Sequence, residues 1–281
     1  MNWLKHTAKQ VLTTLPNTCG PRRVVLCYHS VHPSLPYASV RPEIFASHLA
    51  WLAAECEVVP LDRILERRTP QARPAVALTF DDGYADNHAQ VAPLLEQFGL
   101  PATFFITTGL IDRVDAVIQR FAIQRACAPD TLASLNWAEI ADLRGRGFAI
   151  GAHTHTHPVL AELDDARARD ELVRAKDLLE HRLGFPVTTL AYPYGKPGRH
   201  YTERTVALAA SAGFAHAVGV SFRGVEATDR ALELPRFFIA GDALADLQAK
   251  VRGDWDRIGH WQERAPRWLA RVVSPKDFAL G

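Results

Sequence analysis

The sequence has 281 residues, of which 48% are hydrophobic and 22% charged, a composition typical of a globular protein with one large domain. A formal net charge of +1 gives no reason to expect nucleic acid as a partner. The four cysteines lack CxxC spacing, which argues against a disulfide framework and against a zinc site made of thiolates.

Short apolar runs alternate with helical patterns along the chain. We expect strands at residues 22–29, 57–60, 75–80, 102–107, 148–152, 188–192, 214–218 and 232–239. The helices expected between them cover residues 42–55, 61–68, 86–98, 137–146, 163–183, 202–212 and 242–251, and residues 109–135 form an excursion from the repeat. This alternation predicts a single-domain α/β fold, a barrel of seven or eight parallel strands, with an open doubly wound sheet as the alternative.

The two ends of the chain differ from this repeat. Residues 1–20 and 253–281 place apolar side chains among basic ones, so we expect helical extensions on either side of a barrel at residues 21–252. Each extension either packs on the barrel or lies on a membrane surface. No secretory signal and no apolar stretch of membrane-spanning length is evident, which favours the cytoplasm, with possible peripheral contact at the inner membrane. No pattern indicates an oligomeric state.

Two adjacent carboxylates, Asp81 and Asp82, follow the apolar run at residues 75–80. Neighbouring carboxylates raise each other's pKa unless a third group gives the two side chains different roles. A metal ion would do so, because one Asp becomes a ligand while the other stays free as a base. The alternative is that Asp81, Asp82 and Gly83 only form a turn.

His153 and His157 are four residues apart, so in one helical turn both rings would face the same way. Two imidazoles and one carboxylate form an open site for zinc or a similar divalent ion, and the alternative is a surface histidine tract. His155, between them, would point away and is structural. Tyr28-His29 and Tyr194 also follow expected strands, and barrel strands deliver such residues to one rim.

Three segments carry a family resemblance: residues 79–83 (TFDDG), 151–158 (GAHTHTHP) and 191–195 (AYPYG). They resemble the ordered motifs of the polysaccharide deacetylases, that is, carbohydrate esterase family 4 or the NodB homology domain, over residues 24–239. The resemblance implies a distorted (β/α) barrel that removes N-acetyl groups from amino sugars by metal-assisted hydrolysis. By this resemblance Asp81 is the catalytic base, Tyr194 supplies a backbone N–H to the oxyanion, and the metal ligands are Asp82, His153 and His157. Zinc is the default ion, and cobalt, nickel or iron also suit these ligands.

The chain departs from the family pattern at three points. Ala191 stands where the family has an Arg that orients the base, and Arg236 is the best substitute, unless it forms an ordinary strand-end ion pair. The family's Leu-x-x-His motif is missing, but Tyr28-His29 resembles a branch whose early His is the general acid. His29 is therefore our candidate acid, and its alternative is a buried histidine that closes the barrel. The Asp-x-x-Asp-Trp motif has no clear counterpart, so the sugar groove is undefined. Three aromatic side chains would either stack on a sugar or pack inside the protein: Trp137, Tyr84 and Tyr201.

The expected substrate is an N-acetylated sugar in a polysaccharide, a glycan precursor or a lipid-linked sugar. Two alternatives remain open at this point. One is hydrolysis of another amide, such as a formyl group, on a small sugar-like molecule. The other is an inactive barrel that only binds carbohydrate, an idea suggested by the missing motif Arg.

Overall fold

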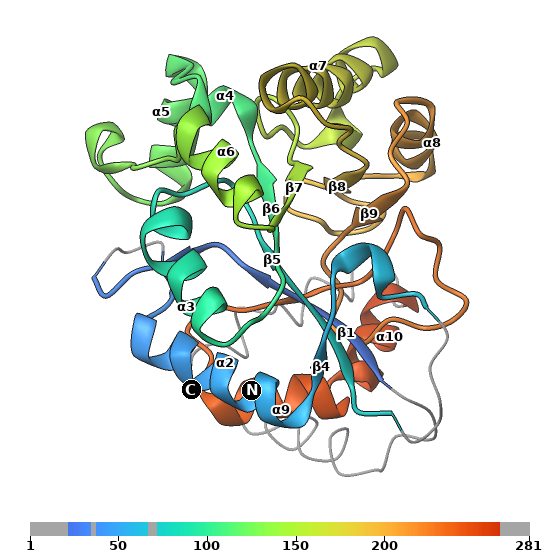
Figure 1. Cartoon of the computed structure of the whole chain (residues 1–281). Coiled ribbons are helices and arrows are strands. Elements are labelled where there is room, and N and C mark those ends of the chain that lie inside the picture. The colour runs from blue at the N-terminus through green and yellow to red at the C-terminus, as the bar shows by residue number, and fades with distance from the viewer. Residues whose placement is uncertain (1–21, 35–37, 67–71, 265–281) are drawn as a thin grey trace.

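The computed structural model describes residues 22–34, 38–66 and 72–264 (Figure 1). The expected extension at residues 1–20 lies outside the described residues, and so does the part of the C-terminal extension beyond residue 264. Their predicted structure and membrane contact therefore stay predictions. Among the helices of the described ranges, none combines the length and apolar character needed to cross a bilayer.

The core of the fold is an eight-stranded sheet whose paired strands all run parallel. Its order is β10-β1-β5-β6-β7-β8-β9, with β4 also paired to β5. The strands are β1 (Arg23–Tyr28), β4 (Glu57–Val58), β5 (Ala75–Phe80), β6 (Thr103–Ile106), β7 (Ala149–Ala152), β8 (Thr189–Ala191), β9 (His216–Val218) and β10 (Phe237–Phe238). A small separate sheet pairs β2 (Ser30–Val31) with β3 (Ala38–Val40).

The last strand segment links the two edges of the large sheet. Leu234 forms a parallel bridge with Val218 at the end of β9. A few residues later, Phe237 and Phe238 pair with Leu26 and Cys27 of β1. The sheet therefore curls into a partly closed barrel in one domain, which confirms the expected distorted barrel and excludes an open doubly wound sheet.

Helices surround this sheet, and Figure 1 shows α7 and α8 beside β7 to β9 at the top right while α2 and α9 lie side by side at the bottom. Their bounds are α2 (Pro42–Glu55), α3 (Ala92–Gln97), α4 (Thr108–Ile111), α5 (Asp115–Gln124), α6 (Trp137–Gly145), α7 (Asp165–Leu183), α8 (Glu203–Ser211), α9 (Leu244–Arg252) and α10 (Asp256–Arg264). Helix α6 begins with a capping box, in which Asn136 and Glu139 each accept a hydrogen bond from the other's backbone N–H.

Two expected helices differ from the structure. The helix expected at residues 61–68 is only a 3-10 turn, Leu61–Arg63, among its described residues. The helix expected at residues 86–98 begins with a π-helical segment, Asn87–Val91, before α3. Asp86 does not cap it, because its carboxylate accepts hydrogen bonds from the Ser30 hydroxyl and the Val31 backbone N–H instead. This region of the chain is thus joined to β2.

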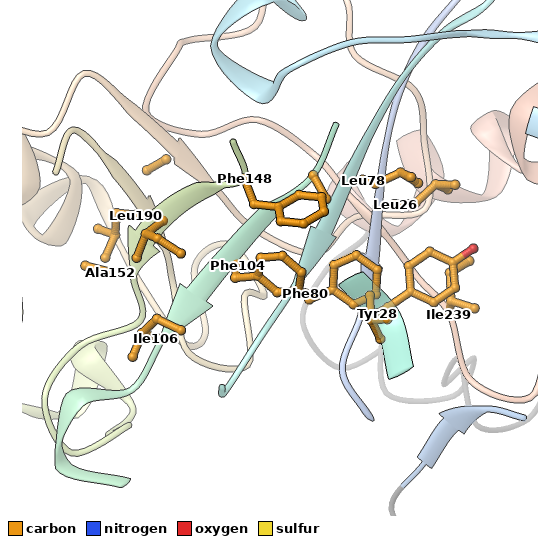
Figure 2. Packing of buried hydrophobic residues seen from close by; sticks show 14 of the residues in the cluster. Leu26, Tyr28, Leu78, Phe80, Phe104, Ile106, Phe148, Ala152, Leu190 and Ile239 are labelled. Atoms are coloured by element: carbon orange, nitrogen blue, oxygen red, sulfur yellow. The ribbon is translucent and has the colours of Figure 1, made fainter. Parts of the chain in front are cut away.

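Strand side chains alternate between two apolar layers. One face of β1 and β5 packs under the helices, and Figure 2 shows the ring of Tyr28 beside that of Phe80, followed by those of Phe104 and Phe148. The Tyr28 and Phe80 rings stack at 5.4 Å between centroids, and those of Phe80 and Phe104 at 5.1 Å. The other face fills the barrel interior with Val25, Ala77, Phe105, Ala191 and Leu234, among others. Because successive residues alternate, Cys27, Thr79 and Asp81 continue the interior face.

Candidate metal centre and active site

The end of β5 turns sharply at the two carboxylates. Asp82 has a φ of 77° and Gly83 a φ of 86°, both left-handed. Glycine adopts this conformation freely and Asp does so at modest cost. The turn separates the two side chains, and both are buried, with Asp81 3% and Asp82 0% exposed.

Asp82, His153 and His157 come together as the sequence predicts. Asp82 Oδ1 lies 3.5 Å from Nε2 of His153 and 3.6 Å from Nε2 of His157. Two ligand atoms about 2.0–2.1 Å from one tetrahedral ion would be about 3.3 Å apart. The three side chains are therefore spaced as ligands of a single divalent ion.

Hydrogen bonding around these side chains also fits an ion. His153 Nδ1 donates to the carbonyl oxygen of Ala191 over 2.7 Å, which leaves the Nε2 lone pair directed at Asp82. Asp82 Oδ1 and His157 Nδ1 are buried and have no hydrogen-bond partner in the described part of the chain. A buried oxygen without a partner is costly, so Asp82 Oδ1 between two imidazole nitrogens suits a cation.

The histidine loop, residues 153–159, does not form the helical turn that the four-residue spacing of His153 and His157 predicted. Residues 153–159 are non-helical, and Thr154 and His157 have φ values of 62° and 56°. The His153 and His157 rings nevertheless lie 4.8 Å apart, because the left-handed residues fold the loop back on itself. His155 points elsewhere, as expected, and its Nδ1 lies 2.9 Å from the hydroxyl of Thr108.

Glu171 of α7 holds this loop in place. Its Oε2 accepts hydrogen bonds from the backbone N–H groups of His155 and Thr156, at 3.0 and 2.7 Å. Its Oε1 accepts a further one from the Thr156 hydroxyl at 2.6 Å. A charged acceptor makes such bonds stronger than neutral ones, so α7 anchors the segment between the two histidines.

Arg236 binds the other carboxylate with both arms of its guanidinium. Its two terminal nitrogens donate to Oδ1 and Oδ2 of Asp81, each at 2.8 Å, and the Arg236 side chain is 0% exposed. Burial alone would raise the pKa of Asp81, but Arg236 together with His153 and His29 outweighs it and holds that pKa at about 2. Arg236 thus occupies the place beside Asp81 that the missing motif Arg was expected to fill.

His29 lies beside Asp81, in a cluster with Cys27. Its ring, the Cys27 thiol and the Asp81 carboxylate present atoms that all lie within 4.8 Å of one another. Its backbone N–H donates to the Ser39 hydroxyl, and its carbonyl accepts from the side chain of Asn87. Desolvation lowers the pKa of the His29 imidazole to about 4, so the ring is neutral at neutral pH.

Tyr194 stands at the rim of the site. Its backbone is left-handed, with a φ of 60°, and its ring lies 4.8 Å from that of His157. The side chain is 37% exposed, and its hydroxyl accepts a hydrogen bond from Gln124 at 2.6 Å. Of the other aromatic candidates, Tyr84 and Tyr201 are 0% and 1% exposed, so they pack in the core and cannot stack on a sugar.

Sequence reasoning missed Arg125, the residue that directly follows α5. Its terminal nitrogen donates to Asp82 Oδ2 at 2.6 Å and its Nε to the Tyr84 hydroxyl at 2.8 Å. Burial would raise the pKa of Asp82, but Arg125 and the nearby histidines hold it well below its usual range. Arg125 belongs to the irregular excursion and to no motif, so no sequence signal marked it.

A family model describes the middle of the chain: the one for polysaccharide deacetylase matches residues 68–217, more than half of the sequence. The chain belongs to the polysaccharide deacetylase family. The match spans the Asp81-Asp82 turn, the histidine loop and Tyr194, whereas His29 and Arg236 lie outside it.

Two curated members of the deacetylase family show how distant the relationship is. A protein of Bacillus subtilis (strain 168) named "Putative polysaccharide deacetylase YxkH" is 24% identical over 194 residues, 68% of this chain and 61% of the relative. The peptidoglycan-N-acetylglucosamine deacetylase of Bacillus cereus is 25% identical over 128 residues, 45% of this chain and 38% of the relative. The chain therefore spans less than two thirds of the length of either protein.

Two solved structures share the fold. The Streptococcus pyogenes deacetylase PplD, in complex with acetate, superposes with a TM-score of 0.68 and 23% identity, over 83% of this chain and 99% of that one. IcaB from Ammonifex degensii gives a TM-score of 0.66 and 22% identity, over 84% of this chain and 99% of that one. At this level of identity the likeness establishes the distorted barrel.

Proposed function

We propose that the protein hydrolyses the N-acetyl group of an amino sugar, with one divalent ion held by Asp82, His153 and His157. The observation that carries the proposal is the buried, unpartnered Oδ1 of Asp82, 3.5 and 3.6 Å from two imidazole nitrogens. Membership in the polysaccharide deacetylase family supports the same reaction class. Zinc is the expected ion, and cobalt, nickel or iron suit the same ligands.

Each site residue has one task in this proposal. The bound ion supplies a Lewis acid for the amide carbonyl and an activated water. Asp81, oriented by Arg236 and with a pKa of about 2, is ionised at neutral pH and accepts a proton from the attacking water. The backbone N–H of Tyr194 donates to the developing oxyanion at the rim.

Departure of the amine requires one proton at its nitrogen, and we assign this transfer to His29. Because the pKa of His29 is about 4, its ring does not carry that proton in advance at neutral pH. The water releases it, Asp81 accepts it, and His29 receives it within the same cluster and passes it to the nitrogen as the C–N bond breaks. The closeness of the His29 ring and the Asp81 carboxylate supports this relay.

The proposed substrate is an N-acetylglucosamine polymer or a precursor of one. The names of two relatives, the peptidoglycan-N-acetylglucosamine deacetylase and a chitin deacetylase of Colletotrichum lindemuthianum, support an N-acetylated glycan. A deformylase remains the second enzymatic candidate, because the site residues define the reaction and not the acyl group. Cytoplasmic location with membrane contact through the ends of the chain stays a prediction.

The first test is the metal content of the wild type and of His153→Ala, purified alike without added metal. We expect about one divalent ion per wild-type chain and a large loss in the variant, because two of three protein ligands do not hold the ion. A wild type that binds no ion, even when zinc or cobalt is offered, would reject the proposal.

Activity is then measured as acetate released from N-acetylglucosamine oligomers, with N-formyl analogues assayed for formate in parallel. Asp81→Asn and His29→Gln should each lower the rate by roughly 100-fold or more while the ion is retained. Faster formate than acetate release would favour the deformylase. A metal-loaded wild type that binds the oligomer but releases neither acid would identify an inactive binding barrel.

A further inference from the structure

Arg125 reaches the proposed metal ligand from a part of the chain that has no motif. It directly follows α5, in the excursion between β6 and β7, and its side chain is 24% exposed while that of Asp82 is 0% exposed. One guanidinium nitrogen donates to Asp82 Oδ2 at 2.6 Å, and Nε donates to the Tyr84 hydroxyl at 2.8 Å. Two contacts with fixed donors set the orientation of the planar group.

The consequence for Asp82 is that its two oxygens face different partners. Oδ2 is engaged by Arg125, and Oδ1 faces the two imidazoles with no hydrogen-bond partner in the described ranges. The side chain is thus presented with one oxygen free.

The adjacent carboxylate is treated differently. Both oxygens of Asp81 accept hydrogen bonds from Arg236, which supplies the positive charge that balances this carboxylate. Two arginines from distant segments therefore divide the pair. Arg236 binds both oxygens of Asp81, and Arg125 binds one oxygen of Asp82. This division answers the problem of two like charges side by side, because each charge has its own cation.

We propose that Arg125 is a positioning residue that restricts Asp82 to a single free oxygen for the divalent ion. This inference rests on the proposed function, because it assumes that Asp82 is a ligand. A carboxylate can bind a cation through one oxygen or through both. With Oδ2 held by Arg125, only the one-oxygen mode is open, and a position at the ion stays available for water and substrate.

The test uses the full chain loaded with Co²⁺, whose visible absorption reports coordination. Arg125→Met removes the N–H donors but keeps an unbranched side chain. Arg125→Lys keeps a cation, without the planar fork that serves both Asp82 and Tyr84. Arg113→Met is the matched control, because Arg113 lies in the same excursion and its guanidinium donates to the Leu132 carbonyl and to no site residue within the described ranges.

We expect Arg125→Met to bind one Co²⁺ at least as tightly as the wild type, because a nearby positive charge has been removed. Its visible absorption should weaken, since binding by both oxygens of Asp82 raises the coordination number. Acetate release should fall roughly 10–100-fold, the usual cost of losing a group that orients a metal ligand. Arg125→Lys should shift the spectrum in the same direction by less, and Arg113→Met should match the wild type.

Three results would overturn the inference. The first is a folded Arg125→Met with the wild-type spectrum and rate. The second is that Arg125→Met loses Co²⁺ and activity to the same extent, which would mean that Arg125 only stabilises the segment in which it lies. The third applies if Arg125→Met does not fold and Arg125→Lys does: the Co²⁺ spectrum of Arg125→Lys is then the same as that of the wild type. A wild type that takes up no Co²⁺ would instead reject the proposed function itself, so the two failures are distinguishable.

Discussion

Replacing Arg236, the side chain paired with Asp81, should show how much stability the fold derives from one buried ion pair. Arg236 donates two 2.8 Å hydrogen bonds to Asp81 and two more, at 3.0 Å each, to the Thr79 hydroxyl and the Gly219 carbonyl. Both partners of the ion pair are buried, with 0% and 4% of their side chains exposed. Arg236→Met would leave a carboxylate uncompensated in the barrel interior.

The expected cost is about 3–5 kcal/mol of unfolding free energy, the usual penalty for breaking a buried pair by removing one partner. For a domain of this size, 1 kcal/mol corresponds to roughly 2–4 °C in Tm, so we expect a fall of about 6–20 °C. The measurement is urea unfolding of the wild type and the variant, both with chelator present so that metal binding does not contribute.

The pH dependence of that cost separates a charge effect from a packing effect. In the wild type the pKa of Asp81 is lowered from 3.8 to about 2, so its stabilising contribution is present above about pH 4 and is lost as the pH falls through 2. In Arg236→Met, burial raises the pKa of Asp81 above its ordinary value, so the variant gains relative stability as the pH falls. The difference between the two proteins should therefore be largest at pH 7 and smaller at pH 4.

A second substitution completes the test. Asp81→Asn removes the charge, so adding it to Arg236→Met should restore stability, although it destabilises the wild type. The reasoning is refuted if Asp81→Asn fails to stabilise Arg236→Met, or if the difference in unfolding free energy is the same at pH 7 and pH 4.

Three further substitutions test how the site is supported. Glu171→Gln weakens the charged anchor of the histidine loop, so metal affinity should fall roughly 10-fold or more by chelator competition, while Asp170→Asn, an exposed neighbour, should leave it unchanged. Gly151→Ala places a Cβ 2.5 Å from the Phe105 ring and 2.6 Å from the Thr189 hydroxyl, and should lower the unfolding free energy by about 1–3 kcal/mol in urea; an unchanged midpoint would show that β7 moves aside. Asn136→Ala removes the cap of α6 and should cost about 0.5–2 kcal/mol in the same assay, whereas Asn136→Asp, which keeps a capping oxygen, should cost less.

The parts of the site that follow strands were predictable, because a parallel sheet brings strand ends to one rim. This reasoning collected Asp81, Asp82 and His153, and the missing motif Arg directed attention to Arg236. It failed for Arg125, since an arginine in an irregular excursion has no periodicity that shows where its side chain reaches. It correctly brought His153 and His157 together, but it assumed a helical turn that the loop does not form. Left-handed residues other than glycine cannot be recognised from sequence.

Four residues at the site, Asp82, Thr154, His157 and Tyr194, have φ values between 56° and 77°. An ordinary side chain in that region costs roughly 1–2 kcal/mol, less for Asp, so together they forgo several kcal/mol of a total that is commonly 5–15. Glycine would remove this cost at each position, and at Asp82 and His157 it would also remove a proposed metal ligand. Directed evolution for heat resistance alone should therefore drift toward glycine or asparagine here and lose activity, whereas paired selection for both traits should keep these residues and find its gains in the surrounding helices.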